Sequence, residues 1–129
     1  MTPLIYPFLS TVGKSEFMKN NGFNLNTTPI HYDIIREIVK NEFPTSLSKS
    51  RATDVIALRF SIIAILYKYR HLLGFSLIKI GKVFHKDHAT VLHAVRKVKE
   101  WHDVNGYEKE LETFEVVRKI MVKHINRLI

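Results

Sequence analysis

The sequence predicts an all-α domain. Hydrophobic residues recur every three or four positions in several segments, and no segment alternates polar and apolar residues between turn signals. Residues suited to begin and end helices separate these segments. The chain has 129 residues, of which 46% are hydrophobic, and this suits one compact domain with a core. We therefore expect a five-helix domain over residues 27–129, with a central helix-turn-helix, preceded by an N-terminal arm over residues 1–26.

The first expected helix begins near Thr28; either Thr27 or Thr28 can cap it, and Pro29 suits the first helical position. Its apolar residues, at helical spacing, are Ile34, Ile35, Ile38 and Val39. Pro44 follows its end, and a polar loop over residues 45–53 leads to the second helix, expected over residues 53–73. The core stripe predicted for this helix comprises Val55, Leu58, Ile62, Ile65, Tyr69 and Leu72. Gly74 is placed to end it.

The remaining three helices follow in quick succession. Ser76 can cap a short third helix, whose core residues are Leu77, Ile80 and Phe84. After a turn at residues 85–86, the fourth helix runs from Asp87 to about His102. Its predicted inner face comprises Val91, Ala94 or Val95, Val98 and Trp101. Residues 105–106 break this helix, and the last one covers about residues 108–128, with an apolar stripe of Leu111, Phe114, Val117, Met121, Ile125 and Leu128.

The charge balance favours an anionic partner. There are 20 Lys and Arg against 12 Asp and Glu, and this gives a net charge of +8, which is typical of proteins that bind nucleic acid or an anionic surface. Cysteine is absent, which excludes disulfides and thiolate metal sites. The most apolar stretch, residues 55–75, is interrupted by charged residues, and the N-terminus lacks a basic segment typical of a signal peptide. We therefore expect a cytoplasmic protein with no membrane partner.

The third and fourth helices together predict a helix-turn-helix. In that unit the start of the second helix enters the major groove of DNA, so residues 87–90 would lie closest to the base edges. A carboxylate such as Asp87 can accept from cytosine N4, and the methyl group of Ala89 can contact the thymine methyl. Asp87 is equally suited to cap the helix, and one residue can do both. Three residues share one face that can extend from bases to phosphates: Thr90, His93 and Lys97.

Residues 87–97, Asp-His-Ala-Thr-Val-Leu-His-Ala-Val-Arg-Lys, resemble the signature of a known family, the C-terminal DNA-binding domain of the bacterial replication initiator DnaA. In that family the run is typically Asp-His-Thr/Ser-Thr-Val, an aliphatic residue, His-Ala and then basic residues. Residues 76–84 are similar to the family's Ser-Leu-x-x-Ile-Gly-x-x-Phe, directly upstream. A looser resemblance extends from about Thr28 to Trp101.

The resemblance implies binding of double-stranded DNA at short asymmetric sites like DnaA boxes. It places Asp87, His88 and Ala89 at bases in the major groove. The resemblance also puts Arg51, in a basic loop, into the adjacent minor groove, where arginine favours narrow A·T tracts. Together with the helix face that carries Thr90, His93 and Lys97, the resemblance leads us to expect base contacts from Arg51, Asp87, His88, Ala89 and Thr90. The expected backbone contacts are Lys49, Leu77, Lys82, Lys86, His93, Arg96 and Lys97.

The sequence departs from the family in several ways, one of which is the short turn at residues 85–86. Ala89 replaces the usual Thr or Ser, so preference at the corresponding base is expected to be relaxed or altered. The basic loop around Arg51 carries fewer cations than is usual in the family. Residues 13–15, Gly-Lys-Ser, match the end of a phosphate-binding loop, but Phe8 stands where that motif needs glycine. We therefore expect a stand-alone DNA reader without an ATPase module, acting in replication or transcription regulation.

Other functions have less support in the sequence. His88 and His93 are five residues apart, which does not match a zinc pattern, and the acidic residues are too dispersed for a nuclease. We expect no catalytic activity, metal or cofactor. The alternative is a protein-interaction module that binds a replication initiator or another partner, using the apolar stripe of the last helix, although a stripe of this kind is more often part of a core. The apolar arm at residues 4–12 could support a homodimer.

Overall fold

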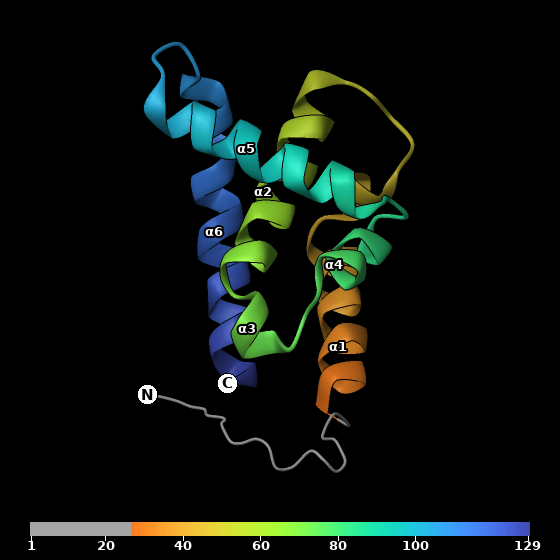
Figure 1. The fold of residues 1–129 in the computed structure, drawn as a ribbon. Helices are drawn as coiled ribbons and strands as arrows, with labels where there is room; N and C mark the ends of the chain where they lie inside the picture. Colours follow the sequence, from red (N-terminus) through yellow and green to blue (C-terminus); the bar gives the residue numbers. More distant parts are fainter. Residues whose placement is uncertain (1–26) are drawn as a thin grey trace.

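The computed structural model describes residues 27–129 of the chain; the predicted arm and the Gly-Lys-Ser segment lie outside the described residues. Within 27–129 the chain forms six α-helices and one 3₁₀ turn and no strand, which confirms the all-α prediction (Figure 1). The elements are α1 (Thr27–Glu42), η1 (Pro44–Leu47), α2 (Thr53–Lys68), α3 (Arg70–Leu73), α4 (Leu77–Val83), α5 (His88–Asp103) and α6 (Glu108–Leu128).

Helix α2 is the centre of the domain. It packs most extensively on α6 and α5 and also contacts η1 and α4, while α5 lies across one end of the molecule (Figure 1). Because neighbours surround it, α2 buries residues on more than one face, among them Ala57, Ile63 and Leu66. The single stripe predicted for residues 53–73 was therefore too narrow. It also wrongly included Leu72, which is 41% exposed.

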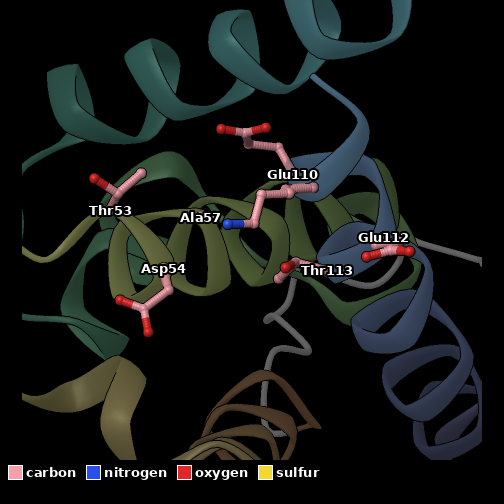
Figure 2. A pocket seen from close by; sticks show the side chains of 7 residues that line it. Thr53, Asp54, Ala57, Glu110, Glu112 and Thr113 are labelled. Carbon is pink, nitrogen blue, oxygen red and sulfur yellow. The ribbon is translucent and has the colours of Figure 1, made fainter. Parts of the chain in front are cut away.

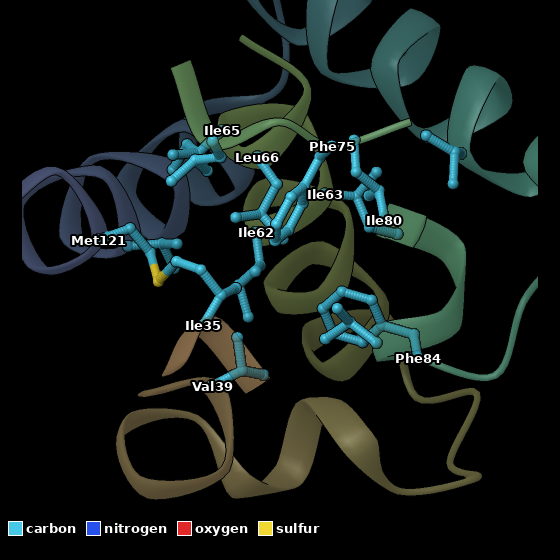
Figure 3. Packing of buried hydrophobic residues seen from close by; sticks show 14 of the residues in the cluster. Ile35, Val39, Ile62, Ile63, Ile65, Leu66, Phe75, Ile80, Phe84 and Met121 are labelled. Carbon is cyan, nitrogen blue, oxygen red and sulfur yellow. The ribbon is translucent and has the colours of Figure 1, made fainter. Parts of the chain in front are cut away.

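The main core joins α1, α2, α4 and α6. Ile35 and Val39 of α1 meet Ile62 of α2 and Met121 of α6, all four fully buried (Figure 3). Complete burial of such a side chain contributes about 1.5–3 kcal/mol, so this cluster is the main source of stability. Ile34, one of the four apolar residues at helical spacing in this helix, is 37% exposed and lies outside the core. The inner face predicted for residues 87–102 is confirmed, with Ala94 rather than Val95 fully buried.

A second, smaller cluster attaches the far half of α5 to α2. Ala57 of α2 packs with Val98 and Trp101 of α5, and Leu111 and Phe114 of α6 lie against them. These contacts hold α5 along its length, from the main core at Val91 to this cluster. The start of α5 is thereby kept in a fixed orientation relative to the rest of the domain.

The helix predicted over residues 53–73 is interrupted at Tyr69. Arg70 Nη1 donates to the carbonyl oxygen of Tyr67 at 2.7 Å, and its guanidinium lies 3.8 Å from the centre of the Tyr67 ring. This contact occupies a carbonyl at the end of α2, and the chain bends into the single turn α3. Gly74 then ends the turn in the left-handed conformation, with φ 71°, as the sequence predicted.

Part of the polar loop predicted over residues 45–53 is the 3₁₀ turn η1. Pro44 starts it, which suits the first turn of a helix, because proline has no N–H to leave unpaired. Ser46 is fully buried, and its hydroxyl donates to the carbonyl of Phe43 at 2.6 Å. Local hydrogen bonding of this kind is typical of serine and stabilises the turn in place of an open loop.

Candidate nucleic-acid interface

The turn between α4 and α5 is closed by two main-chain hydrogen bonds. The N–H of Lys86 donates to the carbonyl of Gly81 at 2.9 Å, and the N–H of His85 donates to the carbonyl of Lys82 at 3.3 Å. This pair of bonds is the Schellman motif that ends many helices. His85 occupies the left-handed position, with φ 56°, where histidine is tolerated better than most non-glycine residues. The motif accounts for the short predicted turn.

Gly81 allows α4 to approach this turn closely. A Cβ atom built on Gly81 would lie 2.3 Å from the main-chain oxygen of Lys86 and 3.3 Å from that of Asp87. Both neighbours are backbone atoms and cannot rotate away as a side-chain tip can. The glycine therefore fixes how α4 and the start of α5 meet, and so fixes the direction in which α5 projects its first turn.

Asp87 caps α5. Its Oδ1 accepts from the main-chain N–H of Thr90 at 2.9 Å and from the Thr90 hydroxyl at 2.8 Å. These two hydrogen bonds lower the pKa of Asp87, which is therefore charged and can only accept at neutral pH. Neither bond uses Oδ2, so capping leaves an acceptor for a base edge. The capping role predicted for Asp87 is confirmed, and it is compatible with base contact.

Most of the residues predicted to touch DNA lie on the surface, whereas Thr90, whose hydroxyl bonds to Asp87, is half-buried. The exposed ones are Lys49, Arg51, Lys82, Lys86, Asp87, His88, Ala89, His93 and Arg96. In the view of Figure 1, the connection from η1 to α2 and the start of α5 lie at the same end of the molecule. His93 is oriented by α2, because its ring meets that of Phe60 edge-on, with centroids 5.7 Å apart. The structure thus presents the start of α5 together with a set of cations.

Two predicted backbone contacts are less exposed. The side chain of Leu77 packs against the main core, so only its main chain can approach a phosphate. Lys97 is partly buried, and its Nζ lies 3.3 Å from a carboxylate oxygen of Glu100. Glu100 also accepts a hydrogen bond from the Tyr107 hydroxyl. The Tyr107 bond first, and then Lys97, lower the pKa of Glu100, so the carboxylate is charged beside the lysine at neutral pH.

Glu100 is therefore expected to weaken the attraction of Lys97 for DNA. We expect Glu100→Gln to tighten binding to a random-sequence duplex and to steepen its salt dependence by up to about one phosphate equivalent, a slope change of about −0.9. Fluorescence anisotropy titrations across salt concentrations measure both quantities. Glu115→Gln is a matched control, because Glu115 pairs with Arg118 at the same helical spacing on α6. Equal effects from both variants would show that only net charge matters.

Arg59 was not among the predicted site residues, although it interrupts an otherwise apolar helix. It is 6% exposed, and its guanidinium points at the connection before α2. Its Nε donates to the Ser46 carbonyl at 2.9 Å, and Nη2 donates to those of Ser48 at 2.8 Å and Ser50 at 3.4 Å. Burial, and then the positive charge of Arg51, lower the pKa of Arg59. Hydrogen bonds from the buried guanidinium of Arg59 thus hold the basic loop that carries Arg51.

A hollow of about 450 Å³ lies between the first turns of α2 and α6 (Figure 2). Its lining comprises Thr53, Asp54, Ala57, Lys109, Glu110, Glu112 and Thr113. Three carboxylates against one ammonium make this surface repulsive to phosphate. The described residues hold no group of three or more His, Asp or Glu side chains placed for a metal ion. Nor does any helix in residues 27–129 have the length and apolar character needed to cross a bilayer.

Residues 33–98, which extend from α1 into α5, match the family described as the bacterial dnaA protein helix-turn-helix. The chain belongs to this family. The match includes the whole of α4, the turn and the first part of α5, and also the loop supported by Arg59. No curated protein and no solved structure matches the chain. The DnaA helix-turn-helix is a DNA-binding unit, and the structure presents its second helix, α5, with the first turn exposed.

Proposed function

We propose that this domain binds double-stranded DNA with a sequence preference, at sites like DnaA boxes, and that it serves in replication or transcription regulation. The observation that carries the proposal is the first turn of α5. Asp87, His88 and Ala89 are exposed there, on a helix start that the Asp87 cap and the turn at Gly81 hold in place. A rigid helix start with polar tips is what reading the major groove requires.

The surrounding cations support this function. Lys82 and Lys86 lie just before α5, and Arg96 lies along its exposed side. Phosphate contacts from such side chains set the register of a protein on DNA without reading sequence. Lys49 and Arg51 on the connection before α2 supply a second contact, which we assign to the neighbouring minor groove. The net charge of +8 favours association at low salt.

The preference we expect is close to that of the family but altered at one base. The Oδ2 atom of Asp87 can accept from cytosine N4, and His88 can donate to or accept from several base edges. Ala89 has no hydroxyl and offers only a methyl group, which suits contact with a thymine methyl. Discrimination at the base opposite Ala89 therefore depends on apolar contact in place of a hydrogen bond.

Selection of binding sites from random duplexes, with the full chain at two salt concentrations, tests this function. We expect enrichment of a site like the DnaA box, with a changed preference at one position. Affinity should fall steeply with salt, with a slope of about −0.9 for each phosphate neutralised. Enrichment of no sequence, together with binding to a protein partner at high salt, would instead support an interaction module.

The surface predicted for such an interaction module is used inside the domain. Val117, Met121 and Ile125, the centre of the apolar stripe of α6, are buried against the core. The centre of the stripe therefore stabilises the fold and is not available to a partner. The predicted homodimer contact, at residues 4–12, lies outside the described residues. DNA binding is the function with direct support from the family and from the exposed helix start.

A further inference from the structure

Arg59 is a buried cation whose hydrogen bonds all go to the segment before α2. None of the ion pairs within residues 27–129 includes Arg59. Its three acceptors are all main-chain carbonyls, from residues 46, 48 and 50. An arginine whose only role was stability would be costly here, because burying a guanidinium incurs a desolvation penalty that neutral acceptors only partly offset. The arrangement indicates that the conformation of the loop matters.

The acceptors alternate along the chain. The carbonyls of Ser46, Ser48 and Ser50 all bond to one guanidinium. These three bonds also restrict the main chain of the residues between them. The serines also stabilise the loop locally: Ser48 Oγ accepts from the N–H of Ser50 at 3.3 Å, and Ser50 Oγ accepts from the N–H of Ala52 at 3.2 Å. Residues 48–52 belong to no helix, so these bonds and Arg59 fix their path.

Arg51 lies directly after the last of these acceptors and is exposed. When a side chain on a flexible loop enters a narrow groove, the loop loses conformational entropy, and this loss weakens binding. A loop that is already held in its bound conformation in the free protein avoids this cost on binding. Arg59 also places a second positive charge close enough to Arg51 for the two to repel each other. A DNA phosphate near the loop would relieve that repulsion, which makes the pair more favourable in the complex than in the free protein.

We propose that Arg59 is a positioning residue that holds residues 46–50 so that Arg51 enters the minor groove, and that it thereby sets the preference for A·T pairs beside the major-groove site. The proposal rests on the DNA-binding function given above. Arg59 itself does not touch DNA. Its planar fork is the feature that lysine cannot reproduce, because the bonds come from two separate nitrogens, Nε and Nη2, and an ammonium group has only one.

The test compares duplexes that share the selected site and differ only in carrying A·T or G·C pairs where the minor-groove contact falls. The wild-type chain should prefer the A·T duplex, and Arg51→Ala should abolish the preference. Arg59→Lys should reduce the preference about tenfold, as expected for a lost groove contact. In the Arg51→Ala background, Arg59→Lys should change the preference no further. Arg36→Lys, an exposed residue of α1, is the matched control.

A second variant tests the same loop in case Arg59→Lys does not fold. Ser50→Gly loosens the loop and removes the hydrogen bond to the N–H of Ala52, while Arg59 and the core stay intact. It should lower the A·T preference as Arg59→Lys does, with an unchanged thermal midpoint. The proposal is wrong if both variants keep the wild-type preference, or if their effects are additive with Arg51→Ala. A wild-type chain that selects a site but ignores the flank also overturns it, whereas failure to bind any duplex overturns the proposed function.

Discussion

Replacement of Gly81 by alanine is expected to lower the free energy of unfolding by about 3 kcal/mol, at the upper end of the range for overpacked cores. The added Cβ would lie 2.3 Å from the main-chain oxygen of Lys86, far inside van der Waals contact. Relief requires the turn to move, and movement breaks the bond from the Lys86 N–H to the Gly81 carbonyl. The start of α5 would be displaced with it, so sequence-selective binding should fall as well.

Urea denaturation followed by circular dichroism measures the loss of stability. Lys82→Ala is the control, because Lys82 is the next residue in α4 and its side chain is exposed. It should unfold within about 0.5 kcal/mol of the wild-type chain, as surface substitutions usually do. Equal stabilities for the two variants would mean that α4 and the turn are not packed backbone to backbone at Gly81.

Replacement of His88 by alanine is expected to weaken binding to the selected site by about 1–3 kcal/mol, the range for a lost base contact. This corresponds to roughly a 5- to 150-fold rise in Kd. His88 is the first residue of α5 and is exposed, so removing its ring costs the fold little. Binding to a random-sequence duplex depends on phosphate contacts and should stay nearly unchanged.

Competition titrations with selected and random duplexes at one salt concentration measure the two affinities. His71→Ala is the matched control, because His71 is also an exposed histidine but lies on α3, outside the helix-turn-helix. It should alter neither affinity. If His88→Ala instead binds the selected site as tightly as the wild-type chain, or weakens both duplexes alike, His88 does not read a base.

Helix positions were predictable because the signals that set them are local. A capping side chain acts on the N–H groups of the next three residues, and a glycine or histidine in the left-handed region acts on the turn it ends. Ser76, Gly74 and Asp87 therefore marked boundaries that the structure confirms. The division at Tyr69 was not predictable in this way, because it accompanies one rotamer of Arg70 that bonds to the carbonyl of Tyr67.

Burial was predicted less well for α2 than for α5. Helix α5 has one core face, so its buried residues repeat at helical spacing and the stripe could be read directly. Helix α2 has neighbours on several sides, so periodicity carries little information about which residues are buried. The burial of Arg59 could not be predicted for the same reason, because a charged residue in an apolar helix is equally consistent with a solvent-facing position.

The sequence by itself determined the helix-turn-helix and the identity of the residues at the start of α5, because capping, helical period and turn chemistry act over a few neighbouring positions. Only the tertiary structure decided how the cations are used. Lys97 and Glu100 lie three residues apart on α5, so that pairing is local, but Tyr107, which bonds to Glu100, comes from beyond the end of the helix. Arg59 bonds to a loop that lies 9 to 13 residues earlier. Whether a cation is available to a phosphate depends on the charges and carbonyls beside it in space, and contacts such as those of Tyr107 and Arg59 form only in the fold.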